Sequence, residues 1–579
     1  MVQEGAGSSK ARFLELYRQH PIPLPTEYYK GKKACDAAEK LLHNTLVVNA
    51  RLESMPYSLD TLDWNVHFSA QRSTFLLYLQ GLTPVEILVN AYTQTEHLPY
   101  LEQARKFVES WNAYARNKVR SAFNKYCWYD HTASLRTATF IYLGRVAAEH
   151  DLWEDDFYDL LFRLLEAHGA WLNRDDKYAE HHNHGIMQDQ ALLYAGVFFQ
   201  RRDWISHGME RLSRQAEWAF NAEGVHKENS SGYALMVSRL LQKIHKFLVD
   251  SGETPAETIS DAAQRSKEYL EWCTMPNGIL VQIGDTQRQV MPVPSPSSCQ
   301  KFYPEAGMYF YRSKAQGHPG DGTWKVIKAG YVNTEHKHCD DGSFVLYGKG
   351  HEIFSDCGIY GYEKDRYRAY FLSAKAHNTV VVDDSTYPCS AEKCHEVGML
   401  GHQCFPAYDH VRMFHNSYPG VRFVRDFCSA DDLTVLMDTL TSGQSHTYSQ
   451  LFHLSEDMQL LEVNDEGACL RLADTGYLVR LRQWGGGTSF SLIRGELSVP
   501  DYGLISRGTG QVAVTTTLKF DITAENALFA TTITIEDPDG FVRLGENRAG
   551  AGGLCFDAQT RTFTLGGLTI PCGRPLPEH

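Results

Sequence analysis

Two histidines that stand two residues apart, His336 and His338, have a spacing that could do chemistry. They lie in the run T-E-H-K-H-C-D-D, between segments typical of strands. On a β-strand, residues i and i+2 point to the same face, so we expect both imidazoles to project into one space. The chain has 25 histidines, so a chance pair is the competing interpretation.

Two further side chains downstream could join this pair in a metal site. The run F-S-D-C-G contains Asp356, and A-K-A-H-N-T-V-V-V contains His377. Two histidines and a carboxylate form a ligand set that suits an ion such as zinc. One histidine of the pair would then be left free for chemistry.

Polar side chains also gather in three stretches of the N-terminal half, at places where helices are expected to begin. These stretches are W-Y-D-H-T-A-S-L-R, H-H-N-H-G-I-M-Q-D-Q and E-G-V-H-K-E-N-S-S-G-Y. Helix capping is the competing interpretation, because Asn, Asp and Ser are preferred N-cap residues. The candidate residues in them are Trp128, Asp130, His131, Arg136, Asn183, His184, His226, Glu228, Asn229 and Tyr233.

The elements that must position these residues change type along the chain. Up to about residue 290, apolar residues recur at three- and four-residue spacing, which predicts helices with antiparallel neighbours. The run M-P-V-P-S-P-S-S predicts an extended linker over 291–300. Beyond it, alternating β-branched residues and Gly, Asp and Asn turns predict an antiparallel β-sandwich over 301–579, with 543–579 as a small closing β segment.

The composition excludes some classes of function. Hydrophobic residues make up 43% of the 579 and charged residues 22%, which is typical of a globular protein. The formal net charge of −14 argues against nucleic-acid and membrane-surface partners. No apolar run reaches the roughly 18 residues that span a bilayer.

Cysteines and the N-terminus bear on the compartment. The 13 cysteines form no C-x-x-C pair and are expected to be thiols in a reducing compartment. The first residues, M-V-Q-E-G-A-G-S-S-K, contain no apolar signal region. We therefore expect a cytoplasmic protein as the sequence is written, and a periplasmic or secreted one if a leader has been removed.

Taken in order, these motifs resemble those of the heparinase II/III-like polysaccharide lyases. The resemblance rests on W-x-D-H-x-x-x-x-R, N-H-G-x-x-Q-D, E-x-V-H-x-E-N-S-x-G-Y, H-K-H-x-D-D, S-D-C-G-x-Y and A-H-N-T-V-x-V, and it extends from about residue 60 to about residue 460. It implies an N-terminal (α/α) toroid, which is an incomplete helical barrel, followed by a C-terminal antiparallel β-sandwich.

The resemblance also implies β-elimination on a uronic-acid-containing polysaccharide or oligosaccharide, most simply a glycosaminoglycan. Asn183 would hold the substrate carboxyl group with His184 beside it, Tyr233 would be base, acid or both, and His336 would be the partner acid or base. The division of labour between Tyr233 and His336 stays open. The remaining substrate contacts implied are Trp128, His131, Arg136, Glu228 and Asn229.

By the same resemblance, His338, Asp356 and His377 would bind a structural divalent metal, usually zinc, that fixes the segment carrying His336. The metal would be a support rather than an electrophile. The cations near the expected site are few, which favours a substrate with little or no sulfate: Arg136, Lys227, Lys337, Arg366 and Arg368.

Other functions remain open at this point. Alginate and bacterial exopolysaccharides are alternative lyase substrates. A glycoside hydrolase on an α/α scaffold needs two carboxylic acids, for which Glu228, Asp130 and Asp189 are available. A catalytically silent glycan-binding protein is the remaining alternative. The oligomeric state is open, with a dimer as one option.

Overall fold

The computed structural model describes residues 8–22, 29–50, 52–66, 68, 72–116, 125–295, 297–313 and 318–573. The chain divides into two compact units, which are described separately. Unit 1 comprises Met1–Trp218 and Arg239–Ala263, and unit 2 comprises Ala219–Ser238 and Gln264–His579.

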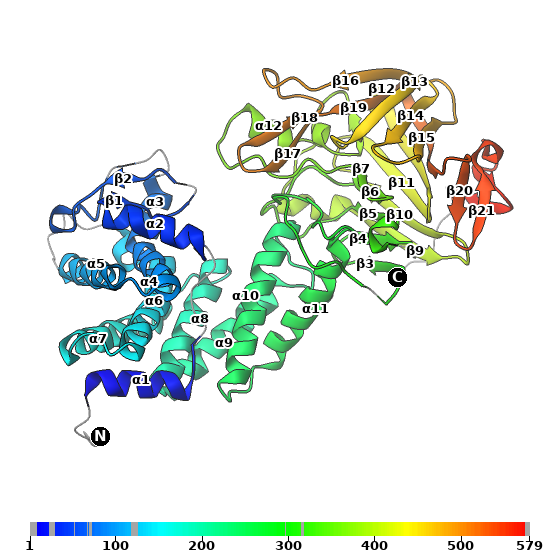
Figure 1. Ribbon diagram of the computed structural model, residues 1–579. Helices are drawn as coiled ribbons and strands as arrows, with labels where there is room; N and C mark the ends of the chain where they lie inside the picture. The colour runs from blue at the N-terminus through cyan, green and yellow to red at the C-terminus, as the bar shows by residue number, and fades with distance from the viewer. Residues whose placement is uncertain are drawn as a thin grey trace. The chain divides into compact units, whose positions relative to one another are not determined.

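Unit 1 is helical, as its sequence periodicity predicted (Figure 1). The central helix is α6, which packs against α1, α4, α7 and α8 and is buried on most of its sides, with Arg136 and Thr137 among its buried polar residues. A two-stranded hairpin, β1 (Thr45–Leu46) with β2 (Met55–Pro56), and three 3₁₀ turns complete the described elements. The helices are α1 (Ser9–Gln19), α2 (Lys32–Leu42), α3 (Arg72–Gln80), α4 (Thr83–Thr95), α5 (Leu98–Arg116), α6 (Asp130–Glu149), α7 (Asp155–Leu172), α8 (Asn183–Phe198) and α9 (Arg202–Ala219).

Helices α10 (Ser231–Asp250) and α11 (Glu257–Cys273) are divided between the two units. The start of α10 and the end of α11 belong to unit 2, because their apolar side chains share a core with the five-stranded sheet. In this core, Leu235 of α10 and Trp272 of α11 lie with Trp324 of β5. The change from helix to strand lies between α11 and β3. Residues 291–295 and 297–299, where a linker was predicted, form no helix or strand.

Unit 2 contains two main antiparallel sheets (Figure 1). The five-stranded sheet has the order β3-β4-β5-β6-β7, with β3 (Gln300–Tyr303), β4 (Met308–Arg312), β5 (Trp324–Lys328), β6 (Phe344–Gly348) and β7 (His351–Phe354). The 12-stranded sheet is built around the order β13-β14-β15-β19-β12-β11-β10-β9. Its strands are β8 (Val380–Val382), β9 (Val397–Cys404), β10 (Asp409–His415), β11 (Val421–Ala430), β12 (Leu433–His453), β13 (Met458–Asn464), β14 (Gly467–Leu472), β15 (Leu478–Gln483), β16 (Ser489–Arg494), β19 (Thr516–Glu536), β20 (Phe541–Leu544) and β21 (Asn547–Gly550).

One apolar core fills the space between these sheets, which makes unit 2 the antiparallel β-sandwich that was predicted. It joins side chains of β5 and β6, such as Ile327 and Leu346, to side chains of β12, such as Leu436 and Leu451. Because β5 also carries Trp324 and Val326 on its other face, it is buried throughout rather than alternating. Smaller sheets are formed by β17 (Leu504–Gly508) with β18 (Gln511–Val514), and by β22 (Cys555–Asp557), β23 (Thr562–Leu565) and β24 (Leu568–Pro571).

The loops of unit 2 carry His336 and the predicted metal ligands. The long loop from β5 to β6 holds His336 and His338, and the chain after β7 leads through Asp356 to the short helix α12 (Arg366–Leu372). A 3₁₀ turn, η6 (Ala374–Ala376), then presents His377 just before β8. Within the described ranges, no helix is both long and apolar enough to cross a bilayer.

Candidate active site

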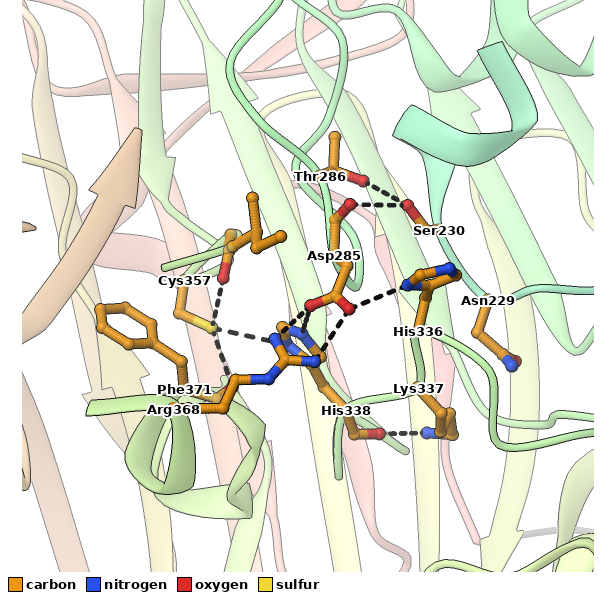
Figure 2. A network of polar contacts seen from close by, with 12 residues as sticks. Asn229, Ser230, Asp285, Thr286, His336, Lys337, His338, Cys357, Arg368 and Phe371 are labelled. Carbon is orange, nitrogen blue, oxygen red and sulfur yellow. Dashed lines mark hydrogen bonds and ion pairs between the residues drawn. The ribbon is translucent and has the colours of Figure 1, made fainter. Parts of the chain in front are cut away.

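Asp285, which was not among the predicted site residues, lies at the centre of the candidate site in unit 2 (Figure 2). One of its carboxylate oxygens, Oδ2, lies 3.0 Å from Nδ1 of His336, and the other, Oδ1, lies 3.0 Å from Nε2 of His338. Arg368 donates to both oxygens, with Nη2 2.9 Å from Oδ2. Three cationic or imidazole groups, two from the β5–β6 loop and one from α12, therefore converge on one buried carboxylate.

The charge of Asp285 determines which ring nitrogen of His336 carries a hydrogen. Burial alone would raise its pKa, but the hydrogen bonds from His336, His338 and Arg368 outweigh burial and hold the pKa well below its usual range. An ionised carboxylate can only accept, so Nδ1 of His336 carries the hydrogen that points to it. The lone pair of Nε2 is then left on the other side of the ring.

Tyr233 lies directly against this histidine. The rings of Tyr233 and His336 are stacked, with centroids 3.6 Å apart and an interplanar angle of 16°. The hydroxyl of Tyr362 lies 2.8 Å from the Tyr233 hydroxyl and 3.5 Å from Nδ1 of His336. Burial raises the pKa of Tyr233, and the hydrogen bond with Tyr362 opposes that rise. A phenol and an imidazole, the two proton-transfer groups predicted from the sequence, are thus in contact.

The backbone around Tyr233 explains its position. Ser230 caps α10, since its Oγ accepts a hydrogen bond of 3.2 Å from the backbone N–H of Tyr233. The hydroxyl of Thr286 accepts another, of 2.9 Å, from the backbone N–H of Gly232. The capping interpretation therefore holds for this stretch as well, and the cap places Tyr233 in the first turn of the helix.

The loop that carries His336 and His338 differs from the expected strand. It forms no strand, and His336 adopts a left-handed φ of 55°. The expected i, i+2 alternation was wrong, because this segment makes turns between β5 and β6. The two imidazoles nevertheless share one environment, since both reach the same carboxylate.

A hydrogen-bonding side chain and a close backbone approach at a glycine place this loop next to the start of α10. Asn229 donates from Nδ2 to the backbone oxygens of Asn333, at 2.9 Å, and Glu335, at 3.1 Å. Gly284 passes between the two segments, and a Cβ there would lie 2.3 Å from the oxygen of Asn229 and 2.8 Å from that of His336. Asn229, predicted as a substrate contact, therefore acts in this structure as a clamp on the loop.

Glu228 is a further carboxylate of this site. Its Oε2 lies 3.5 Å from Nε2 of His336, and its side chain is 11% exposed. Burial raises the pKa of Glu228, while His336 lowers it. The described part of unit 2 therefore places Glu228 on the same side of His336 as the available lone pair.

A second group of side chains, suited to a metal ion, lies behind His338. The predicted ligands His338, Asp356 and His377 are joined by Cys357, and one ligand atom from each of the four lies within 4.8 Å of the others. All four residues are buried. Cys357, within the run S-D-C-G, was not among the predicted ligands. The donor set of imidazoles, carboxylate and thiol is one that transition metals such as zinc prefer.

The predicted residues of unit 1 form a cluster of their own. Asp130 Oδ1 lies 3.1 Å from Nδ1 of His184, and the rings of His131 and His184 meet edge to face at 4.8 Å. Burial lowers the pKa of His131 to about 4, so it is neutral near pH 7. His182 caps α8 through its side chain, and the buried Oδ1 of Asn183, the first residue of the helix, has no hydrogen-bond partner among the described residues.

Arg136, predicted as a substrate contact, has no exposed surface in this structure. Its Nε donates to Nε2 of His168 at 2.9 Å and its Nη2 to the backbone oxygen of Cys127 at 2.7 Å. Trp128 packs on His168, with ring centroids 4.7 Å apart, and is half-buried. We therefore interpret Arg136 as a structural residue that fixes the segment before α6.

Comparison with known proteins agrees with this architecture. The heparinase II/III N-terminus model matches residues 5–311. The heparinase II/III-like C-terminal model matches residues 295–536. A heparin-sulfate lyase of Pedobacter heparinus is 23% identical over an alignment of 248 residues that covers 36% of this chain and 37% of that protein. The aligned part thus spans little more than a third of that relative.

Solved structures share the fold over nearly the whole chain. A heparinase III has a TM-score of 0.76 at 16% identity and covers 97% of this chain and 94% of its own. The heparan sulfate lyase HepC of Pedobacter heparinus has a TM-score of 0.72 at 17% identity, with 99% and 93% covered. A chondroitin AC lyase of Streptomyces coelicolor has a TM-score of 0.55 at 11% identity, with 91% and 82% covered. With both halves matched by its family models, the chain belongs to the heparinase II/III family.

Proposed function

We propose that this protein is a polysaccharide lyase that cleaves a uronic-acid-containing polysaccharide, of the glycosaminoglycan type, by β-elimination. The observation that carries the proposal is the stacked pair of Tyr233 and His336. Elimination needs a base for the C5 proton and an acid for the departing O4 oxygen at one place, and a phenol beside an imidazole supplies both. The relatives named as heparin-sulfate and chondroitin AC lyases support the same reaction class.

We assign the base to His336 and the acid to Tyr233. Asp285 holds the hydrogen on Nδ1 of His336, so Nε2 can take the C5 proton. Because burial raises the pKa of Tyr233, its hydroxyl keeps its proton in the resting site. As the C4–O4 bond breaks and the C4–C5 double bond forms, Tyr233 protonates O4. Water then returns both groups to their starting states.

The negative charge that spreads into the uronate carboxylate during elimination must also be neutralised. Asn183 remains our prediction for this role, since its side-chain amide can donate a hydrogen bond to a carboxylate. We expect Asn183→Ala to lower kcat by about 10²–10³-fold, the effect of losing one such donor. An unchanged kcat for this variant would remove Asn183 from the mechanism.

We also propose that a divalent ion, zinc by its chemistry, is held by His338, Asp356 and His377. The fit is supported by the partner of His338, because Nε2 bonded to a carboxylate leaves Nδ1 for an ion. The ion would supply rigidity to the loop that carries His336. Each proton in the elimination is moved by Tyr233 and His336, and the ion transfers none of them.

The charges near the site favour a substrate with little sulfate. Of the cations named in the sequence, Arg136 and Lys337 are buried, and Arg368 is paired with Asp285. Lys337 is held by Asp340 and Asp341. These three side chains are therefore engaged within the protein, which leaves fewer cations for sulfate groups.

A hydrolase is less well supported, because it needs two carboxylic acids beside the scissile bond. Asp189 has no exposed surface and accepts a hydrogen bond from Tyr178 at 2.7 Å. Asp285 is held by three partners and its side chain is 0% exposed. Asp189 and Asp285 are thus both engaged within the protein, so neither is free to act with Glu228 as the second carboxylic acid.

A panel of uronate polymers tests the proposal. Hyaluronan, chondroitin, heparan sulfate before and after chemical desulfation, and alginate are each incubated with the enzyme, and absorbance of the C4–C5 double bond is followed in the ultraviolet. We expect a signal from a glycosaminoglycan, larger after desulfation. Absence of an absorbing product from the whole panel would contradict the proposal, and preference for the more sulfated polymer would contradict the charge argument.

A further inference from the structure

Cys357 lies where a metal ligand would be expected, beyond the three ligands predicted from the sequence. It follows Asp356 directly after β7 and is 2% exposed. Its Sγ lies 3.8 Å from Nδ1 of His338 and 3.9 Å from Nε2 of His377. Figure 2 shows the sulfur directed toward the ring of His338. The thiol therefore faces a nitrogen of both histidines.

These separations are those of atoms that share an ion. With Zn–S near 2.3 Å and Zn–N near 2.0–2.1 Å, a tetrahedral site places sulfur and nitrogen about 3.6 Å apart. The measured 3.8 and 3.9 Å are close to this value and need little adjustment. His338 is oriented for the role, because its other nitrogen is bonded to Asp285 at 3.0 Å. A carboxylate on the outer nitrogen is the usual support of a metal-binding histidine.

We propose that Cys357 binds the metal ion as a thiolate and, with His338, Asp356 and His377, closes a four-ligand site. The proposal rests on the ion proposed above and adds its fourth ligand. Binding would transfer the thiol proton to solvent as the sulfur–metal bond forms. No electron is transferred, and no oxidant is needed.

Two properties follow from this ligand. A thiolate favours zinc, cobalt or cadmium over calcium, magnesium or manganese, which prefer oxygen ligands. Four protein ligands also leave no open position for water, as in structural zinc sites. All four residues are buried, so substrate has no direct access to the ion. The ion therefore stabilises the loop and does not polarise the uronate.

The competing interpretation is that Cys357 is a small buried side chain. Its thiol lies 3.4 Å from the backbone oxygen of Phe371 and 3.6 Å from that of Gly358, and it packs in an apolar cluster with Tyr370. Such contacts are those of a weak S–H donor. They predict no spectroscopic link between the sulfur and a bound metal, which separates the two interpretations.

Cobalt substitution tests the proposal without relying on activity. The full chain is produced in cells supplied with cobalt in place of zinc, and its metal content and absorption spectrum are measured. We expect about one cobalt ion per chain, an intense sulfur-to-cobalt charge-transfer band in the near ultraviolet, and tetrahedral bands in the visible. Cys357→Ser should lose the charge-transfer band. Cys273→Ser, at a buried cysteine outside the metal cluster, is the matched control and should keep it.

The outcomes separate this proposal from the ones on which it depends. Stoichiometric cobalt without the charge-transfer band in the wild-type protein would overturn the thiolate and leave the other three ligands in place. Failure to bind any divalent ion would overturn the metal site as a whole. The band in a protein that forms no unsaturated product would support the thiolate while contradicting the proposed lyase activity.

Discussion

Replacing Asp285 by Asn is the perturbation that separates the proposed mechanism most clearly from a structural account of the same residues. The carboxylate accepts hydrogen bonds from His336 and His338, each at 3.0 Å, and from Arg368. An amide of the same shape keeps one acceptor oxygen and presents an NH₂ group to the remaining donors. The substitution therefore disturbs the tautomer of His336 without changing the volume of the side chain.

The magnitude follows from two effects. Loss of the carboxylate that orients a catalytic histidine lowers kcat by about 10⁴-fold where it has been measured in serine proteases, and we expect a loss of about 10²–10⁴-fold here. Breaking a buried ion pair by removing one partner costs about 3–5 kcal/mol of stability. Asp285 has a fully buried side chain, so this cost applies to its pairing with Arg368.

Asp438→Asn is the matched control. Asp438 is also fully buried and bonded to an arginine, with its Oδ2 2.6 Å from Nη2 of Arg425, but it lies in β12 within the 12-stranded sheet. Both variants should unfold at lower urea concentration than the wild type. Only Asp285→Asn should also lose kcat, measured from the ultraviolet absorbance of the product on the folded fraction. A folded Asp285→Asn protein with wild-type kcat, or an equal loss of kcat in Asp438→Asn, would refute the reasoning.

The remaining predictions concern the acid, the loop and a buried lysine. Tyr233→Phe should lower kcat by about 10²–10⁴-fold with little change in the melting temperature; full activity would reject its role. Gly284→Ala should lower kcat because a Cβ there meets the backbone of His336, whereas Gly350→Ala, also at positive φ but with nothing within 4 Å, should leave kcat unchanged. Burial lowers the pKa of Lys325 to about 7, below the roughly 10.4 of an unfolded lysine. Between these values the unfolded chain binds more protons, so this lysine makes stability rise with pH from about 7 to about 10. In urea unfolding, the free energy of unfolding of Lys325→Met should therefore exceed that of the wild type most below pH 7, and the difference should shrink toward pH 9. A difference that does not change with pH would contradict this prediction.

Much of the fold could be predicted from local patterns. The three- and four-residue apolar spacing anticipated α4 to α11, and alternation anticipated strands such as β4, β6, β11 and β15. Residues 511–520 and 527–535 each have a strand-like pattern of their own, but they form β18 and one long β19, because pairing with β12 continues through the polar residues between them. The division into units could not be predicted, since it depends on which side chains of α10 and α11 pack on the first sheet.

Site residues could be predicted where the residue type itself suggests a chemical role. They could not be predicted where the role depends on neighbours that only the three-dimensional structure brings together. Tyr233 and His336 were identified, and the structure brings their rings into contact. Asp285 was missed, because a single acid in I-L-V-Q-I-G-D-T matches no motif and gains its role only from partners distant in the sequence. The family resemblance implied that Arg136 contacts substrate. The spacing of residues in the sequence does not reveal that its guanidinium group is buried in the core.

The reaction itself gives the most direct test of the account. Each bond cleaved by elimination produces one C4–C5 double bond and one new reducing end, so the two should rise in a one-to-one ratio when ultraviolet absorbance and reducing sugar are measured in the same digest. We predict that ratio for the wild-type enzyme, with both signals lost together in Tyr233→Phe. New reducing ends without ultraviolet absorbance would show hydrolysis instead and would contradict the account.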